Sequence, residues 1–492
     1  MTIKVKPLTV GPILGVVTDK TARIFARGEY VASSNALHPS WGMESHQLYQ
    51  NAFGVARLRP VGESEFSAPQ FFKLNPNQDM SGVVTLNTLK PETGYEYQIG
   101  WFESESDPQP ELDLDWSEAI EQTFKSGSND PQRSRSFVYG ACRYMQRLAP
   151  GIWRYGEEGD KTFQEIVKQV EEGIETDAFL LVGDQIYADD CFGENADGDF
   201  AIDRYFSRYR MTFSQTYVRE LMGRVPTYMT LDDHDITDNW PGSAGSKEWM
   251  CLYPAALQAY ETYQLSHSPL FVAPEFHQED RYNGDWANAS RLWYTFQDGC
   301  CDFFATDSRT ERQLGDTDDT RMMMSSAQME SLKSWLCDGS GLVKFVITSI
   351  PFFPDKLSGG GLDDDKWGGF LKQRTELLDL IAEKDLKRVV FLSGDVACGM
   401  TAELRCEEKP DFKVISVVSS GLFWPFPHKK AKNFQMEGKL ATLSSRHYTL
   451  AEAGPVVSQD LFTRVTADMK GLTVEVFSSR GELCSTKVHT FE

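Results

Sequence analysis

The stretch that decides the fold is Phe-Leu-Leu-Val-Gly-Asp-Gln-Ile-Tyr, residues 179–187, in which an apolar run ends at Gly183 and polar residues follow at once. Short apolar runs of this length, roughly four to eight residues, are typical of strands that helices or a second sheet bury on both faces. Residues 136–139, 227–231 and 389–392 repeat the arrangement, and are followed by Gly-Ala-Cys, Asp-Asp-His-Asp and Ser-Gly-Asp-Val. All four places predict buried strands that end in chemically useful side chains.

The rest of the second part of the chain alternates such strands with helices. Helical spacing is found in Lys161–Glu172, Ser326–Cys337 and Gly369–Glu383, and further apolar runs occupy residues 344–350 and 414–418. Alternation of this kind predicts a layered α/β domain. In such domains ligands collect beyond the carboxyl ends of the strands.

The first part of the chain has a different pattern, with short β-branched or aromatic segments separated by Gly, Pro and Asn turns. We interpret residues 1–130 as a small β-sandwich, joined by a polar linker to a catalytic domain at residues 131–492. The segment Leu89–Tyr97 resembles the turn into a late strand of fibronectin-like domains.

The polar residues after the apolar runs predict a metal site. If the strands are parallel neighbours, Asp184, the acidic cluster Asp232–Asp235 and Asp395 meet at one edge of a sheet. Carboxylates at such short range do not all stay ionised without a cation. Each motif alone has a plainer interpretation: a common Gly-Asp turn, a solvated or helix-capping cluster, a buried thiol at Cys142 or a packed aromatic at Tyr187.

Composition and charge exclude several classes of function. The formal net charge of −23 repels a nucleic-acid backbone, so a module that binds duplexes is not expected. No stretch approaches the roughly 18 apolar residues that cross a bilayer, and no leader is visible, so we expect a cytoplasmic protein with reduced cysteines and no membrane partner. The chain also lacks a phosphate loop, an H-E-x-x-H helix and a G-x-S-x-G elbow.

Taken in order, the motifs resemble those of the PhoD-like metallophosphatases. The resemblance rests on the following pieces and on the N-terminal segment from Gly11-Pro12 to Arg27: Gly140-Ala141-Cys142, Gly183-Asp184-Gln185-Ile186-Tyr187, Asp232-Asp233-His234-Asp235 with Asn239, Asp307-Ser308-Arg309, and Ser393-Gly394-Asp395-Val396. It implies a four-layer αββα domain and a site with several ions, Fe(III) plus Ca²⁺ or another divalent ion.

The same resemblance, with that to purple acid phosphatases, implies roles for single residues. Cys142, Asp184 and Tyr187 would bind the ferric ion, since thiolate and phenolate are charged donors that suit it. Asp184 would bridge to the second ion, whose oxygens would come from Asp232 or Asp233, Asn239 and Asp395. His234 would hold a phosphoryl oxygen or protonate the leaving group, and Arg309 or Arg312 would clamp the phosphate.

One position departs from the family pattern. PhoD-like sequences usually have histidine after Gly-Asp-Val in the last motif, and this chain has Ala397 there. Either another residue fills the vacancy, with Cys398, His428 and His447 as candidates, or one ion is held weakly.

We therefore expect a metal-dependent phosphohydrolase that acts on small phosphate esters, monoesters or diesters, by means of a metal-bound hydroxide. The alternative is a degenerate PhoD-like relative that binds a ligand or partner without hydrolysing it. The sequence does not indicate an oligomeric state.

Overall fold

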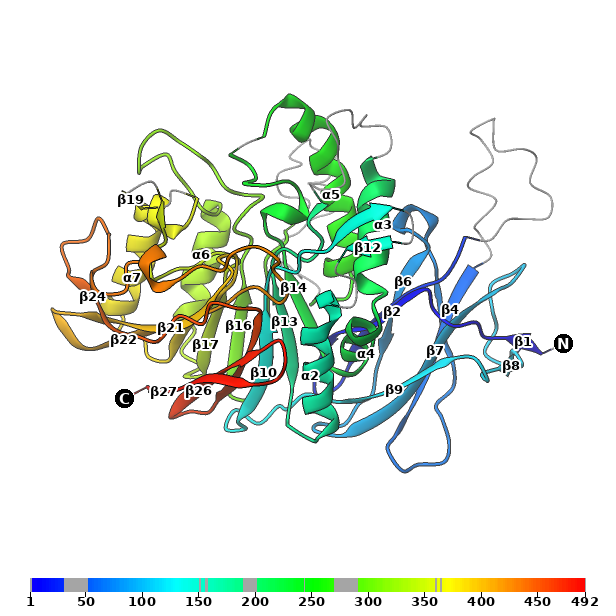
Figure 1. Cartoon of the computed structure of the whole chain (residues 1–492). Coiled ribbons are helices and arrows are strands. Elements are labelled where there is room, and N and C mark those ends of the chain that lie inside the picture. The colour runs from blue at the N-terminus through cyan, green and yellow to red at the C-terminus, as the bar shows by residue number, and fades with distance from the viewer. Residues whose placement is uncertain are drawn as a thin grey trace.

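The computed structural model describes residues 2–30, 52–149, 152–154, 158–188, 201–242, 244–269, 291–358, 361–362 and 365–491. Two large mixed sheets lie face to face in the C-terminal part of the molecule, and two small antiparallel sheets form the N-terminal part beside them (Figure 1).

The N-terminal part is a sandwich of a three-stranded and a four-stranded sheet. The first has β2 (Val10–Val17), β3 (Ala22–Arg27) and β6 (Ser81–Leu86), and the second has β5 (Gln70–Lys73), β4 (Ala52–Pro60), β7 (Gly94–Glu103) and β9 (Ile120–Lys125). Leu14 and Ile24 from the first sheet share one apolar core with Leu58 and Tyr97 from the second. The likeness of this part to fibronectin-like domains stays a prediction, as does a domain boundary after residue 130.

The six-stranded sheet of the second part supplies three of the four sequence motifs. Its strands are, in order, β14 (Thr227–Thr230), β13 (Ala178–Val182), β10 (Arg135–Gly140), β25 (Leu461–Ala467), β26 (Gly471–Ser478) and β27 (Leu483–Thr490). The first three are parallel neighbours, so their carboxyl ends lie at one edge. The remaining pairings are antiparallel.

The eight-stranded sheet supplies the fourth motif. Its order is β15 (Tyr294–Asp298), β16 (Cys301–Ala305), β17 (Val343–Ile347), β20 (Val389–Ser393), β22 (Lys409–Ser419), β21 (Gly399–Cys406), β24 (Tyr448–Ala453) and β23 (Gly438–Lys439). The strands β16, β17, β20 and β22 run parallel to one another.

Helices cover the outer faces of both large sheets. One apolar core joins the six-stranded sheet to α2 (Lys161–Glu171), α3 (Ala201–Phe213), α4 (Thr216–Arg224) and α5 (Tyr253–Tyr260). Another joins the eight-stranded sheet to α6 (Ser326–Leu336) and α7 (Leu371–Glu383). A third core, with Phe137 and Phe345, lies between the sheets. The layers are therefore helix, sheet, sheet and helix.

Short elements complete the described chain. They are the hairpins of β11 (Gln146–Ala149) with β12 (Ile152–Arg154) and of β18 (Leu357–Ser358) with β19 (Gly361–Leu362), the pair β1 (Ile3–Lys4) and β8 (Leu114–Asp115), two π-helical turns at Glu248–Leu252 and Glu261–Leu265, and 3₁₀ turns at Pro76–Gln78, Glu158–Asp160, Asp233–Asp235, Trp367–Gly369 and Ala431–Asn433. No helix in the described part of the chain has the length and apolar character needed to span a bilayer.

The sandwich is fastened to the second part by a buried ion network around Asp79. This carboxylate, in the turn before β6, accepts from Arg27 of β3 at 3.0 Å, from Arg210 of α3 at 2.5 Å, and from Tyr263. Burial raises the pKa of Asp79, but the two arginines and the tyrosine more than offset it and hold the pKa below its ordinary value. A charged contact of this kind fixes how the two parts meet.

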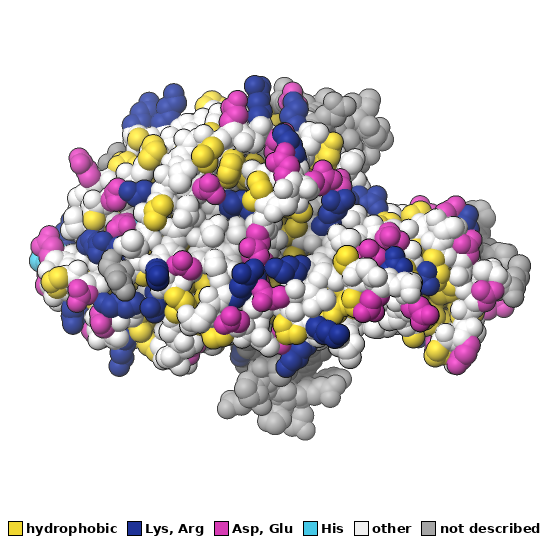
Figure 2. Space-filling model, turned by 90° about the horizontal axis from the view of Figure 1, so that it is seen from below, with side chains coloured by type: hydrophobic (Ala, Val, Ile, Leu, Met, Phe, Trp, Pro, Cys, Tyr) yellow, Lys and Arg dark blue, Asp and Glu magenta, His cyan; other side chains and the backbone are white. Residues whose placement is uncertain are grey.

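Acidic and basic side chains are interspersed on the face of the molecule shown in Figure 2. Exposed ion pairs such as Lys125–Glu175 and Arg133–Glu92 follow the same pattern. The net charge of −23 is therefore not gathered into one acidic patch on that face.

Candidate metal centre

The predicted motifs converge, but from two sheets rather than from one edge of a single sheet. The loops that hold Cys142, Asp184 and Asp232 follow β10, β13 and β14 of the six-stranded sheet, whereas Asp395 follows β20 of the eight-stranded sheet. Close packing of Gly394 joins the two sets, because a Cβ there would lie 2.3 Å from that of Ala141. The prediction of a single sheet edge was wrong. When two sheets stack, the carboxyl ends of strands from both sheets can lie close together, so the four strands need not be neighbours in one sheet.

One side of the centre, which we call the thiol–phenol side, consists of Cys142, Asp184 and Tyr187. The Cys142 thiol donates to Asp184 Oδ2 at 3.2 Å, and the Tyr187 hydroxyl donates to the same oxygen at 3.1 Å. All three side chains are buried. No lysine or arginine in the described part of the chain forms an ion pair with Asp184.

Burial dominates the protonation of this side. It raises the pKa of the Cys142 thiol, the Tyr187 phenol and the Asp184 carboxyl well above their ordinary values, and the charge of Asp184 raises the pKa of the other two further. A bound cation would reverse this, since metal coordination favours the deprotonated donors. Sulfur, phenolate and carboxylate ligands together fit a ferric ion.

The opposite side, which we call the lysine–arginine side, consists of Asp232, Asp233 and Asp395 with Arg309 and Lys366. One carboxylate oxygen from each of these three aspartates and one from Asp184 all lie within 4.8 Å of one another. The Oδ2 atom of Asp232 has no hydrogen-bond partner among the residues that the structure describes. The donors can thus hold a hard cation between them.

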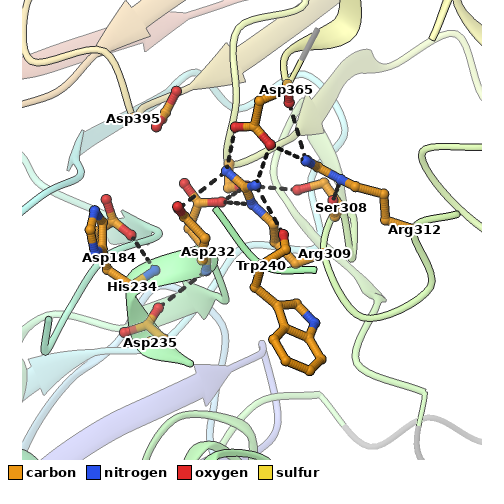
Figure 3. A network of polar contacts seen from close by, with 12 residues as sticks. Asp184, Asp232, His234, Asp235, Trp240, Ser308, Arg309, Arg312, Asp365 and Asp395 are labelled. Atoms are coloured by element: carbon orange, nitrogen blue, oxygen red, sulfur yellow. Dashed lines mark hydrogen bonds and ion pairs between the residues drawn. The ribbon is translucent and has the colours of Figure 1, made fainter. Parts of the chain in front are cut away.

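Arg309 is fully buried and surrounded by acceptors (Figure 3). Its Nε donates to Asp232 Oδ1 at 2.5 Å, and its Nη2 lies 3.1 Å from Asp233 Oδ1. The guanidinium also donates to both carboxylate oxygens of Asp365 and to the carbonyl of Trp240. Arg312 donates to Asp365 as well, at 2.5 Å. Both arginines that the sequence suggested as phosphate clamps are therefore bound to groups of the protein.

Lys366 places an ammonium directly against the centre. Its Nζ lies 2.6 Å from Asp395 Oδ2 and 2.7 Å from Asp365 Oδ2, and the side chain is 7% exposed. Although burial lowers the pKa of Lys366, Asp395 and Asp365 raise it to a net value above the ordinary one. The lysine is therefore a resident positive charge.

The neighbouring aspartates differ in their ionisation. Burial raises the pKa of Asp232 to about 6, even though Arg309 opposes the shift. Burial also raises that of Asp233, but Arg309 and His234 more than offset it, so the pKa of Asp233 is lowered. The two adjacent carboxyls consequently have different charges over part of the acidic range.

Asp235 shapes the centre without facing it. Its carboxylate accepts from the backbone of Gln185 at 3.0 Å and of Asp232 at 3.1 Å, which completes the capping of the 3₁₀ turn Asp233–Asp235. It thereby ties the loop after β13 to the loop after β14. The close approach also requires Gly183 at φ +111, where a Cβ would lie 2.6 Å from that of Asp232. Part of the Asp-Asp-His-Asp motif is thus a structural cap, as the helix-capping interpretation of the motif predicted.

His234 lies beside the thiol–phenol side. Its ring centroid is 4.5 Å from that of Tyr187, its backbone N–H donates to Asp184 at 3.3 Å, and its Nε2 lies 3.6 Å from Asp238 Oδ1. The side chain is partly exposed at 21%, so a substrate can approach it. Asn239 is also exposed and donates its backbone N–H to Asp233 at 2.7 Å.

The residues suggested as substitutes for the missing histidine all have other partners. His428 pairs with Asp460 at 3.0 Å, His447 with Glu408 beyond the far end of β21, and Cys398 packs in an apolar cluster with Met400. Ala397 itself donates its backbone N–H to Ser420 Oγ, and that hydroxyl donates to the Cys142 sulfur at 3.1 Å. Position 397 is thus linked to the thiol–phenol side.

Backbone strain is concentrated in the centre. Among the described residues twelve non-glycine residues have positive φ, and six of them lie here: Cys142, Asp184, Tyr187, Asn239, Asp395 and Ala397. Such conformations cost of order 1–3 kcal/mol each and persist where the surrounding structure enforces them, often at functional sites. The concentration of these conformations in the loops of the centre is what a functional site would show.

Sequence analysis missed Lys366, Asp365 and Ser420. Lys366 follows a run of aspartates, a pattern that is indistinguishable from a solvated loop. Ser420 follows a strand but carries no motif. Only the fold brings these residues to the centre, and no local signal could have identified them.

The comparisons with known proteins agree with this geometry. The family model for PhoD-like phosphatases matches residues 153–452. The chain belongs to the PhoD-like phosphatase family. A solved structure of PhoD resembles this chain with a TM-score of 0.69 at 15% identity, covering 99% of this chain and 89% of the other. A purple acid phosphatase from yellow lupin seeds gives 0.59 at 14% identity, covering 97% and 74%.

Members of the PhoD-like family, and this protein among them, are metal-dependent phosphatases of mixed α/β fold with several sheets. The acidic cluster around Asp184 and Asp232 supplies the candidate metal site that this activity requires. A search of curated proteins finds no match.

Proposed function

We propose that this protein hydrolyses small phosphate esters, monoesters or diesters, at a centre that holds Fe(III) on the thiol–phenol side and Ca²⁺ or another divalent ion on the lysine–arginine side. One observation carries the proposal: Cys142 and Tyr187 both meet the same oxygen of Asp184, and three more aspartates bring an oxygen within 4.8 Å of that residue's carboxylate. This donor set suits one ferric and one hard divalent ion better than it suits a solvated acidic loop.

Bound ions would lower the pKa of coordinated water and neutralise charge on the phosphoryl oxygens. On the thiol–phenol side Cys142, Asp184 and Tyr187 would hold the first ion. Asp184 would also contact the second, with Asp232 or Asp233, Asn239 and Asp395. In this arrangement Asp184 is the one group common to both positions.

His234 is placed to move a proton. The Tyr187 ring packs against the imidazole and fixes its plane, and Asp238 stands near Nε2. An imidazole beside the centre can donate a proton to a leaving-group oxygen. The side chain is 21% exposed, so a substrate can reach it.

Arg309 is proposed to bind phosphate in concert with Arg312. In the structure both guanidinium groups share Asp365, which also accepts from Lys366. A phosphate in contact with Arg309 would have to replace part of the Asp365 contact. Asp365 would then act as a stand-in anion that keeps the arginine oriented before the substrate binds.

A second candidate is a PhoD-like protein that binds a phosphate ester without hydrolysing it. Ala397 in place of histidine supports it, since the site has one nitrogen donor fewer than the family pattern. The complete set of Cys142, Asp184 and Tyr187 favours a hydrolysing enzyme over this binding protein.

The test is a metal analysis paired with hydrolysis assays. The protein is purified without chelator, its iron and calcium are measured, and p-nitrophenyl phosphate and bis-p-nitrophenyl phosphate serve as monoester and diester. We expect turnover of at least one ester that chelation abolishes. Bound iron with no turnover of either ester would support the binding protein, and no bound metal would overturn both.

A further inference from the structure

We propose that Lys366 shares the position of the second ion and competes with it, so that this protein holds one ion tightly and the second one exchangeably. The inference deepens the proposed function, on which its metal assignments rest. The observation behind it is the ammonium of Lys366, buried and 2.6 Å from Asp395 Oδ2, a carboxylate of the metal cluster.

The two sides of the centre are neutralised in different ways. Beside the thiol–phenol side, the described residues supply no lysine or arginine to Asp184. On the lysine–arginine side, four carboxylates (Asp232, Asp233, Asp365 and Asp395) meet three cations of the protein (Arg309, Arg312 and Lys366). The formal charges of these seven described groups sum to −1. This side is thus largely neutralised by the chain itself.

Of the three cations, only Lys366 contacts Asp395. Arg309 lies against Asp232 and Asp233, and Arg312 lies against Asp365. A divalent ion that uses Asp395 as a ligand must therefore take the oxygen that Lys366 now contacts or share this one carboxylate with the ammonium. Two cations a few ångströms apart repel one another strongly in a buried site, so bound ion and ammonium exclude each other.

A lysine is suited to such exchange. Its ammonium is a single charge on a flexible side chain. It already contacts Asp365 at 2.7 Å, and it can keep this partner when an ion binds Asp395. An arginine in the fixed bidentate contact of Arg309 has no such freedom. Lys366 therefore maintains the charge balance when the ion is absent and gives way when it binds.

Calcium alone serves as the probe, measured by equilibrium titration on the full-length, iron-loaded protein without substrate. Lys366→Met removes the charge and keeps an unbranched side chain. We expect calcium to bind at least about tenfold more tightly to this variant than to the wild type, with iron content unchanged. Equal affinity in both proteins would overturn the proposal.

Two control variants isolate the charge. Lys366→Arg keeps a cation at the position and should bind calcium no more tightly than the wild type. Lys372→Met removes an exposed lysine on α7 that pairs with Asp319 at 3.1 Å, and it should also match the wild type. A gain of the same size in either control would show that the effect is not competition at Asp395.

A second variant guards against misfolding of Lys366→Met, which leaves Asp365 and Asp395 with one partner fewer. In Lys366→Met/Asp365→Asn one positive and one negative charge are removed together, so the local formal charge stays at −1. The same tightening is expected, and wild-type affinity in this folded variant would overturn the proposal. Hydrolysis plays no part in the measurement, so a failure of the proposed phosphatase activity would be seen separately, as absent turnover with calcium binding as described.

Discussion

The two sides of the centre solve one problem differently. The lysine–arginine side buries carboxylates and neutralises them with lysine and arginine, whereas the thiol–phenol side buries three acids that pair with neither among the described residues. The first can persist without a metal ion. The second needs either bound protons or a cation from outside.

This difference in how charge is neutralised indicates that the ion on the thiol–phenol side is the one that the structure depends on. Burying an ionised group without a partner costs several kcal/mol, which the chain avoids on one side and accepts on the other. We expect the thiol–phenol side to depend on its ion for both ionisation and activity, and the lysine–arginine side to tolerate the loss of its own.

The largest effect is expected from Asp184→Asn, because Asp184 contacts both donors of the thiol–phenol side. This variant should lose its iron and show no detectable hydrolysis, with iron affinity lowered at least about 100-fold. Elemental analysis and ester assays provide the measurement. Asp302→Asn is the matched control, since Asp302 is buried and pairs with Lys344 at 2.6 Å outside the centre. Retained iron in Asp184→Asn would contradict the difference between the sides.

His234→Ala tests whether the histidine serves chemistry rather than metal binding. Turnover should fall about 10²–10⁴-fold, the usual contribution of proton transfer, while iron and calcium contents stay near those of the wild type. His428→Ala, which removes a histidine paired with Asp460, should leave turnover unchanged. Loss of iron together with activity would show instead that His234 is a ligand of the iron on the thiol–phenol side.

The metal-free protein should lose stability as the pH rises. Burial raises the pKa of Asp232 from 3.8 to about 6, so the folded state keeps a proton that the unfolded state releases. The stability from this group is therefore complete below about pH 4 and is lost as the pH rises through 6, by about 3 kcal/mol. Urea unfolding at several pH values measures it, and Asp232→Asn should reduce the decline by the share of this group, while Asp177, Asp235 and Asp307, whose pKa values burial also raises, keep theirs. A metal-free curve without this decline would show that Arg309 keeps Asp232 ionised.

Tyr187→Phe probes the ferric ion directly. Phenolate bound to iron gives a charge-transfer absorption, so the variant should lose or shift that band while its fold is retained. Tyr139→Phe removes another buried phenol, whose hydroxyl has no hydrogen-bond partner among the described residues, and should leave the spectrum as it is. A colourless wild type with full activity would mean that Tyr187 is only packed.

The smallest effect is expected from Ala397→His, which restores the residue of the family pattern. Position 397 has φ 47, a conformation that histidine adopts more readily than most residues. Because Ser420 links it to Cys142, the added imidazole should alter the iron band more than the calcium affinity. Iron absorption and calcium titration provide the two measurements. No change in either would show that the side chain at position 397 points away from the ions.

Much of this arrangement was predictable from the sequence. The apolar runs located β10, β13 and β20 to within two residues, and the predicted helices end within two residues of α2, α6 and α7, because burial and helical period leave direct traces in the chain. The convergence of Asp184 with Asp395 followed from where strands end. The division between two sheets was not predictable, since an apolar run does not record which sheet it joins.

Side-chain partners were harder to predict than positions. Arg309 was expected to bind a phosphate. Instead it contacts Asp232, which is 77 positions away in the sequence, and Asp365, which is 56 positions away. Only the fold brings these residues together. Lys366 gave no signal at all. Pairing across such distances is set by packing, and no local pattern contains it.

The Asp79 network has a consequence for how the protein can be divided. Arg210 belongs to α3, whose Arg208 donates to the Ile186 carbonyl beside Tyr187, so the helix that contacts the loop after β13 also binds the N-terminal sandwich. Removing residues 1–130 would take away Asp79, the shared acceptor of Arg210 and of the buried Tyr263, and would expose the face that the sandwich now covers. The sandwich is therefore not a detachable module, and a truncated catalytic fragment is a poor choice for expression or for grafting onto other proteins.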